Sequence, residues 1–291
     1  MSFPQSELDR AAAPEVRFAI SAEGFPVAQV GDTAFAMLPG RGDIYFLATA
    51  WCVRRPPDEL VRNDFYGHGG VLGGEEAFRA KVLEQDEHAR EKRALGRREI
   101  HCNADTPWGP SQGATVYAEG VVCHSTAGHG GFHLSSDRNA KVERRLRRPG
   151  GWYEEDAEWA IVALTLPHLF TSFERRSAER TVKDAWPDAW EAIFCTVLEP
   201  GQSHEKDRRT FHARHADDWI VISAIRSEQQ DGFVEVIATL GGMRGQDAEQ
   251  RRFLVPAAEY KIGRFGFVVD PARHDAYDGP SSFIGWRPSS Q

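Results

Sequence analysis

The N-terminal part of the chain alternates short apolar runs with turn signals, a pattern typical of a β-sheet. The runs, within about residues 16–50, are RFAIS, FPVAQV, TAFAML and DIYFLATAW. A helix is predicted over residues 75–98, where Phe78, Val82 and Leu83 share one face. The second half of this segment is strongly charged, so we expect it to face solvent. Residues 16–100 are therefore predicted to form a β-rich unit with one helix.

The pattern changes at residue 101. Strands are predicted for ATVYAE, VVCHST and GFHLS, with a Glu119-Gly120 turn and a turn over residues 128–131 between them. A helix follows, because apolar side chains recur at i, i+3, i+4 and i+7: Trp159, Val162, Ala163 and Leu166. We place the acidic residues 154–156 in its first turn, where the helix dipole favours negative charge. Ser172 is expected to cap a second helix and Pro187 to open a third.

The last part of the chain returns to a β pattern. Residues 199–218 are polar and unpatterned, which is typical of a linker. Beyond them, DWIVISAI, GFVEVIATL, RRFLVP and RFGFVVD are four candidate strands. We therefore predict an α+β protein in three parts. These are the β-rich unit (16–100), a central α+β domain with a β-hairpin and helices (101–198), and a small barrel-like β module (216–291).

Composition is that of a folded, soluble protein. Hydrophobic residues fill 41% of the 291 positions, and 17 Phe and 8 Trp supply enough apolar surface for a core. The four cysteines form no CxxC pair, and the polar opening segment, residues 1–15, lacks the apolar centre of a signal peptide. No apolar stretch is long enough to span a membrane. We therefore expect a cytoplasmic protein without disulfides.

Candidate chemistry concentrates in HSTAGHGGFH, residues 124–133, which holds three histidines and three glycines. A hairpin centred between Gly128 and His129 would place His124 opposite His133, close enough for both imidazoles to reach one metal ion. His129 would then lie at the tip of the hairpin. Because no recognised metal-ligand spacing is present, we assign no metal ligand.

Acid–base catalysis is the second interpretation of this segment. His129 would transfer protons, and Ser125 or Thr126 would act as nucleophile or substrate contact. A carboxylate of the acidic cluster 154–158, with Glu155 as the candidate, would complete the site, although nothing in the sequence brings that cluster to the hairpin. The third interpretation is structural: His129 serves the turn, His124 and His133 form a polar cross-strand pair, and tryptophans pack around them, namely Trp108, Trp152 and Trp159.

A basic run follows the hairpin and makes nucleic acid a candidate partner. Its candidate contacts are Arg138, Lys141, Arg144, Arg145 and Arg148, of which the last four would share one face if the run were helical. A second basic cluster lies in the predicted linker: Lys206, Arg208, Arg209 and Arg214. The net charge of −8 argues against binding nucleic acid over the whole surface. Ion pairs with neighbouring acidic residues are the alternative role for these side chains.

Three stretches, TPWGPSQ, STAGHGG and WYEEDAEW, resemble an uncharacterised family of proteins from bacterial plasmids, integrative elements and phages. The resemblance covers about residues 105–190. It implies an accessory protein of mobile DNA and transfers no activity. Ser125, Thr126 and His129 fall within the shared pattern, whereas His124 and His133 do not.

Two function classes follow from these observations. The first is an accessory protein that binds a protein or nucleic acid through the basic run or the C-terminal strands. The second is a hydrolase or transferase that uses His129, Ser125 or Thr126, and Glu155. The sequence specifies no cofactor, and a membrane is not an expected partner.

Overall fold

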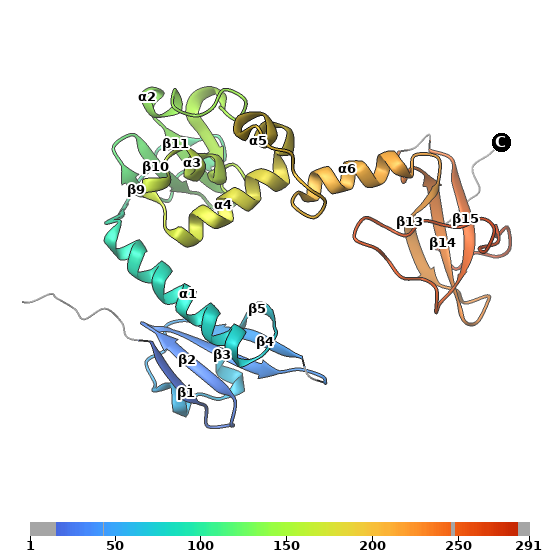
Figure 1. Cartoon of the computed structure of the whole chain (residues 1–291), viewed down its shortest axis with the longest axis horizontal. Coiled ribbons are helices and arrows are strands. Elements are labelled where there is room, and N and C mark those ends of the chain that lie inside the picture. The colour runs from blue at the N-terminus through green and yellow to red at the C-terminus, as the bar shows by residue number, and fades with distance from the viewer. Residues whose placement is uncertain (1–15, 43, 246–247, 285–291) are drawn as a thin grey trace, which may run out of the picture. The chain divides into compact units, whose positions relative to one another are not determined.

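The computed structural model describes residues 16–42, 44–245 and 248–284. These residues form a mixed α+β fold with antiparallel sheets, which confirms the predicted class (Figure 1). They divide into two compact units with the boundary between Thr181 and Val182. The predicted polar leader, residues 1–15, lies outside the described residues. No described helix is both long and apolar enough to cross a membrane.

The first sheet contains five antiparallel strands in sequence order. They are β1 (Arg17–Ile20), β2 (Pro26–Val30), β3 (Thr33–Pro39), β4 (Tyr45–Ala50) and β5 (Gly67–Leu72). Two short 3-10 helices, η1 (Pro57–Glu59) and η2 (Arg62–Asp64), lie between β4 and β5. The first four strands confirm the sequence pattern. The fifth was missed because its sequence, GHGGVL, is rich in glycine, which is depleted in strands.

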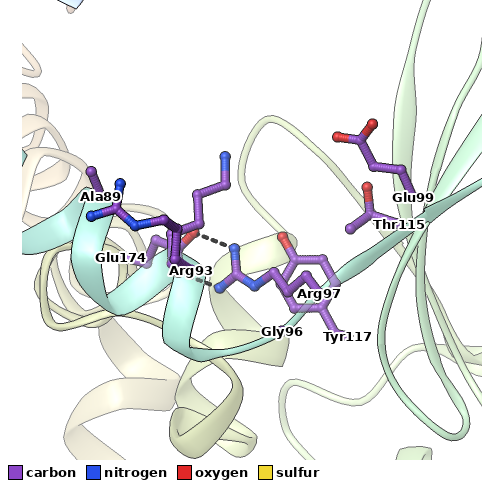
Figure 2. A pocket seen from close by; sticks show the side chains of 9 residues that line it. Ala89, Arg93, Gly96, Arg97, Glu99, Thr115, Tyr117 and Glu174 are labelled. Atoms are coloured by element: carbon purple, nitrogen blue, oxygen red, sulfur yellow. Dashed lines mark hydrogen bonds and ion pairs between the residues drawn. The ribbon is translucent and has the colours of Figure 1, made fainter. Parts of the chain in front are cut away.

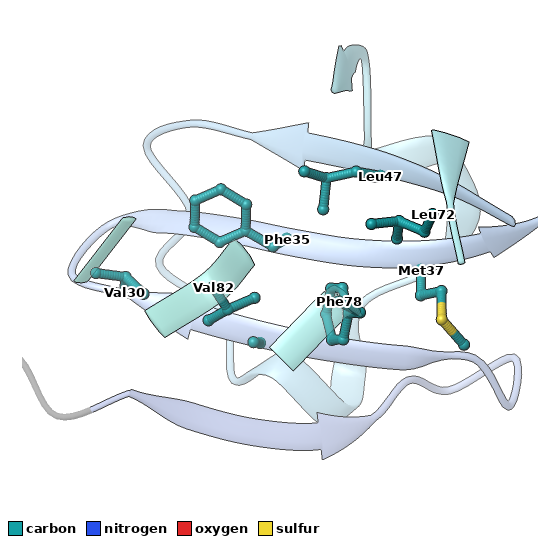
Figure 3. Packing of buried hydrophobic residues seen from close by; sticks show 8 residues of the cluster. Val30, Phe35, Met37, Leu47, Leu72, Phe78 and Val82 are labelled. Carbon is teal, nitrogen blue, oxygen red and sulfur yellow. The ribbon is translucent and has the colours of Figure 1, made fainter. Parts of the chain in front are cut away.

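Helix α1 (Glu75–Ala94) covers one face of this sheet with its N-terminal half. Figure 3 shows Phe78 and Val82 packed among side chains from β2 to β5, and both are at most 1% exposed. Burying two such side chains contributes roughly 1.5–3 kcal/mol each. The expected face of α1 is therefore confirmed at these two positions, whereas Leu83 is 51% exposed.

The charged half of α1 does not simply face solvent, contrary to our expectation. His88 Nδ1 lies 2.8 Å from the Thr171 hydroxyl, and the Glu91 carboxylate accepts a hydrogen bond from the Ser172 hydroxyl at 2.7 Å. Arg176 also pairs with Glu84 at 2.8 Å. Charge patterning could not reveal this, because a polar helix face suits a polar neighbour as well as water.

The second sheet has the strand order β12-β11-β10-β9-β6. Its strands are β6 (Arg98–Ile100), β9 (Gly113–Ala118), β10 (Val121–Ser125), β11 (Gly130–Leu134) and β12 (Trp152–Glu154), and a small pair, β7 (Asp105–Thr106) with β8 (Gly109–Pro110), lies in the connection before β9. The helical elements here are α2 (Ser136–Asn139), η3 (Pro149–Gly151), α3 (Trp159–Thr165), η4 (Pro167–Leu169) and α4 (Ser172–Ala185). The three predicted strands of this region are confirmed as β9, β10 and β11.

Two predicted helix starts are wrong. The acidic residues 154–156 do not form the first turn of a helix, because Glu154 ends β12 opposite Gly131 and α3 begins only at Trp159. Helix α4 is capped by Thr171 rather than Ser172. The Thr171 hydroxyl accepts the Glu174 N–H at 3.1 Å, and the Glu174 carboxylate accepts the Thr171 N–H at 2.8 Å, which is a capping box.

The second unit contains α5 (Pro187–Phe194), which confirms the helix opened by Pro187, and α6 (His204–Arg214). Helix α6 lies within the predicted linker, so that segment is not unpatterned chain. Ser203 caps it by accepting the Lys206 N–H at 3.2 Å. None of its residues is buried, and ion pairs stabilise the helix instead: Lys206 with Glu191, Arg208 with Glu205, Arg209 with Asp188 and Arg264 with Asp207.

The C-terminal sheet has three strands, β13 (Trp219–Arg226), β14 (Phe233–Leu240) and β15 (Gln250–Pro256). The fourth candidate, RFGFVVD, forms a bridge to the free edge of β13 through Ile220 and Val268 rather than a regular strand. A bridge from Phe253 to Ala276 covers the edge of β15. Both edges are thereby protected from pairing with other chains.

A buried ion pair fixes the segment after this sheet. Glu235 is 0% exposed and accepts hydrogen bonds from Arg252 at 2.8 Å, the Ser281 hydroxyl at 2.7 Å and the Ser282 N–H at 2.7 Å. Burial raises the pKa of Glu235, but these hydrogen bonds outweigh burial and hold the pKa below its ordinary value. Its stabilising contribution is therefore present above the ordinary carboxyl pKa and is lost as pH falls through the lowered value.

We expect Arg252→Ala to destabilise the C-terminal sheet by about 3–5 kcal/mol, because it leaves the Glu235 carboxylate buried without its cation. Arg273→Ala is the matched control: its ion pair with Glu259 is exposed, and we expect a loss below about 1 kcal/mol. Hydrogen exchange of the β14 amides in the full chain measures both effects. Equal protection in the two variants would contradict the structural role of this pair.

Candidate functional site

The β10–β11 hairpin carries the histidine-rich segment on a tight turn over residues 126–129. The Thr126 N–H donates to the His129 carbonyl at 2.9 Å, and the His129 N–H donates to the Thr126 hydroxyl at 3.2 Å. The Thr126 hydroxyl also bonds to the His129 carbonyl. Thr126 thus closes the turn with both its backbone and its side chain.

The register of this hairpin differs from our prediction. His124 lies opposite Gly131, and His133 lies opposite Val122, so the two imidazoles are not a directly opposed pair. The turn closes one residue earlier than expected, because Thr126 bonds to His129. Since the side-chain period of a strand is two, His124 and His133 still share one face of the sheet.

An aromatic cluster on that face joins the three stretches that carry the family resemblance. The Trp152 ring lies 4.3 Å from the His133 ring and 5.5 Å from the His124 ring, between centroids. Trp108 meets Trp152 edge to face at 5.8 Å. Trp108 comes from TPWGPSQ, His124 precedes STAGHGG directly, and Trp152 opens WYEEDAEW. Trp108 and Trp152 therefore pack around the histidines, whereas Trp159 packs on Phe170.

His124 is held as a neutral, buried imidazole. The Ser111 hydroxyl donates to the Gly113 carbonyl at 2.9 Å, so its oxygen accepts a hydrogen bond from His124 Nδ1, which lies 3.2 Å away. Burial lowers the pKa of His124, and His133 lowers it further; burial also lowers the pKa of His133. Sequence reasoning missed Ser111, since a lone serine in a loop carries no signal of its own.

His129 lies apart from these two histidines, beside the acidic cluster. Its Nδ1 is 3.9 Å from a carboxylate oxygen of Glu154 and 3.9 Å from one of Glu155. The side chain of His129 is 59% exposed. Ligand atoms of His129, Glu154 and Asp156 lie within 4.8 Å of one another, so these three side chains could together contact a divalent cation.

Pairing of β11 with β12 brings the acidic cluster to the hairpin. Gly131 lies opposite Glu154, and the Glu155 N–H donates to the Gly130 carbonyl at 3.0 Å. Glu158 faces elsewhere and pairs with Arg148 at 2.5 Å. The structure therefore places two of the predicted catalytic residues, His129 and Glu155, side by side.

The two predicted hydroxyls are placed differently. Ser125 lies at the end of β10 opposite Gly130, and its hydroxyl donates to the Gly113 carbonyl at 3.3 Å. Within the described part of the chain, neither Ser125 nor Thr126 forms a hydrogen bond with the His129 ring. Ser125 and Glu155 nevertheless both neighbour Gly130, since Ser125 pairs with it across the hairpin and Glu155, directly after β12, donates its N–H to the Gly130 carbonyl.

The basic run does not form the expected helix, because α2 ends at Asn139 and turns follow it. Three of its arginines are held by internal contacts. Arg138 donates to the Glu119 carbonyl at 3.1 Å, Arg147 donates to the Val142 carbonyl at 2.8 Å, and Arg148 pairs with Glu158. Arg145 lies 3.4 Å from Glu143, whereas Lys141 and Arg144 are exposed and form no ion pair within the described residues.

Two glycines of β11 allow this site to assemble. A Cβ on Gly131 would lie 2.5 Å from the Trp108 ring and 2.3 Å from the Tyr153 carbonyl oxygen. A Cβ on Gly130 would lie 2.6 Å from the Glu155 carboxylate and 2.5 Å from the His124 carbonyl oxygen. All four distances are too short for a side chain, so Trp108 and Glu155 can approach this strand only where it carries glycine.

Fold and site together define a mixed α+β protein with an exposed histidine–carboxylate cluster beside paired tryptophans. Residues 101–216 match a family described as a domain of unknown function (DUF7007). The matched segment contains the hairpin, Trp108, Trp152 and the acidic cluster, so it includes the whole candidate site. No curated protein and no solved structure matches the chain.

We expect Gly131→Ala to destabilise the second sheet by about 1–3 kcal/mol or more, because the new methyl group collides with Trp108 and with backbone. Gly128→Ala is the matched control, since nothing lies within 4 Å of a Cβ there, and its effect should stay within about 0.5 kcal/mol. Denaturant unfolding followed by tryptophan fluorescence separates the two variants. A Gly131→Ala protein as stable as Gly128→Ala would show that this close approach does not matter.

Proposed function

We propose that the protein is a cytoplasmic enzyme of mobile genetic elements, a hydrolase or transferase in which His129 is the general acid and base. The supporting observation is the pair of 3.9 Å distances from His129 Nδ1 to Glu154 and Glu155. At this distance either carboxylate stabilises the positive charge that the imidazole gains as a base, and a small side-chain movement would bring one of them into hydrogen-bond distance of Nδ1, where it orients the ring. Nε2 is then the nitrogen that exchanges a proton with the reactants.

The chemistry that this arrangement favours is attack of a hydroxyl on an electrophilic carbon or phosphorus. His129 Nε2 takes the proton of the attacking hydroxyl while the new bond to oxygen forms. The bond to the leaving group then breaks, and the same proton passes to that group. The hydroxyl comes from water or from Ser125, which lies on the strand next to Gly130. Glu155 is the preferred orienting carboxylate because it packs over Gly130.

His129→Ala is expected to reduce turnover by roughly 10²–10⁴-fold, the usual contribution of a general acid–base. The measurement uses chromogenic carboxylic esters, phosphate esters and glycosides as substrates of the full chain. His168→Ala, another exposed histidine in the same unit, should leave turnover unchanged. Both variants should unfold at the wild-type temperature because both side chains are exposed.

Turnover that survives in His129→Ala would contradict this role of His129. A wild-type protein inactive on all three substrate classes would contradict the enzyme proposal itself. Glu155→Gln adds a second check, since loss of the orienting charge should lower turnover less than loss of the imidazole does.

Binding of nucleic acid through the basic run is the second candidate, as expected for an accessory protein of mobile DNA. Its support is the exposure of Lys141 and Arg144 without an ion pair in the described residues. Arg138, Arg145 and Arg148 would contribute charge although each has a partner.

For this candidate, we expect DNA affinity to fall steeply with salt and to weaken in Lys141→Ala and Arg144→Ala, because each removes a phosphate contact. Arg208→Ala is the control, since its charge is matched by Glu205. Fluorescence anisotropy with a labelled duplex at several salt concentrations measures the slope. Binding that is absent, or insensitive to salt, would exclude this role.

A further inference from the structure

A cavity of about 520 Å³ lies in the first unit, away from the hairpin site. Residues from the end of α1, from β6 and β9, and from the start of α4 line it. Figure 2 shows Arg93 and Arg97 on one side, Thr115 and Glu99 on the other, and Tyr117 between them. Charged and hydroxyl side chains therefore dominate its wall.

Arg97 stabilises the wall of the cavity, but its positive charge is already paired with Glu174. Its side chain is 6% exposed, and its guanidinium binds both oxygens of Glu174, at 2.8 and 2.5 Å. It also donates to the Leu169 carbonyl at 2.8 Å and stacks on the Tyr117 ring at 4.0 Å. Burial raises the pKa of Glu174, but the bonds from Arg97 and the Thr171 N–H outweigh burial and lower it, so the pair stays ionised.

Uncompensated positive charge comes from Lys92 and Arg93 in the last turn of α1. Both are exposed, and neither forms an ion pair within the residues that the structure describes. The Nε of Arg97 is a third donor without an acceptor there, although it is buried. Cations at a helix C-terminus interact favourably with the helix dipole. That stabilising interaction does not depend on a neighbouring cavity.

The opposite wall adds two hydroxyl donors. Thr115 and Tyr117 are two residues apart on β9 and so share one face. No hydrogen bond of either hydroxyl occurs within the described ranges. Burial raises the pKa of Tyr117 to about 12, so the phenol keeps its proton and remains a donor at neutral pH. Two cations and two hydroxyl donors around one cavity suit a phosphate group.

A second cavity of about 610 Å³ shares Ala89 and Lys92 with the first. Three aromatic rings line it, those of Phe35, Trp51 and Phe173. Trp51 is 52% exposed, and a large exposed ring beside a cavity is available for stacking on a ligand. His88 and Gln85 add polar groups, and burial lowers the pKa of His88, so its imidazole is neutral.

We propose that the two cavities together bind a phosphate ester that carries a flat aromatic ring, the chemistry of a nucleotide. The phosphate contacts Lys92 and Arg93 and accepts from Tyr117 and Thr115. The ring lies in the neighbouring cavity against Trp51 and Phe173, and Lys92 stands where the two cavities meet.

Isothermal titration of the full chain with the four nucleoside monophosphates tests this site, with the matching nucleosides and inorganic phosphate as separate ligands. We expect at least one monophosphate to bind at least about tenfold more tightly than its nucleoside or phosphate alone, because each half contributes. Arg93→Ala should weaken that binding by about tenfold or more, the usual loss for a hydrogen bond to a charged group. Trp51→Ala should weaken monophosphate binding and leave phosphate binding unchanged.

Arg98→Ala is the matched control, because Arg98 is an exposed arginine of β6 that does not line either cavity. The Arg98→Ala variant should bind the nucleoside monophosphate with the affinity of the wild type. Three results would overturn the proposal: no monophosphate binds, phosphate alone binds as tightly, or Arg93→Ala and Arg98→Ala behave alike. Thermal unfolding of each variant confirms that the chain is folded in every titration.

Discussion

Close approach to the backbone of β11 is the constraint on which the candidate site depends. Trp108 and Glu155 reach this strand only because residues 130 and 131 are both glycine. Trp108 then supports Trp152 and, through it, His124 and His133, while Glu155 stays beside His129. A side chain at residue 130 or 131 would therefore separate segments that are distant in the sequence but adjacent in the fold.

The β10–β11 hairpin places its histidines in two different environments. Neutral imidazoles of His124 and His133 pack against Trp152, where their function is to fill an aromatic cluster. The imidazole of His129 is exposed beside the carboxylates of Glu154 and Glu155. His124 and His133 thus share the environment of Trp152, whereas His129 lies beside the acidic cluster. On β9, Tyr117 and Thr115 belong to the polar cavity beside α1.

Sequence patterns predicted the elements whose side chains are buried on one face, such as β2, β3 and the Phe78 and Val82 positions of α1. These patterns did not predict elements that lack a repeating apolar face. Helix α6 relies on the Ser203 cap and on ion pairs, and β5 is rich in glycine, so neither has an apolar period. The hairpin register was wrong by one position at its centre, because a hydroxyl of Thr126 closed the turn early. Residue propensities for turns and strands do not predict that hydrogen bond.

By itself, the sequence determined the α+β class, three of the five strands of the second sheet and the choice of His129 and Glu155 as candidate residues, since local periodicity and residue chemistry suffice for these. Only the tertiary structure decided that the acidic cluster begins at the end of a strand and meets the hairpin, because strand pairing between β11 and β12 joins residues about twenty positions apart. It also decided that the charged end of α1 lines a cavity. Long-range contacts of this kind depend on backbone pairing and close packing, which no local pattern encodes.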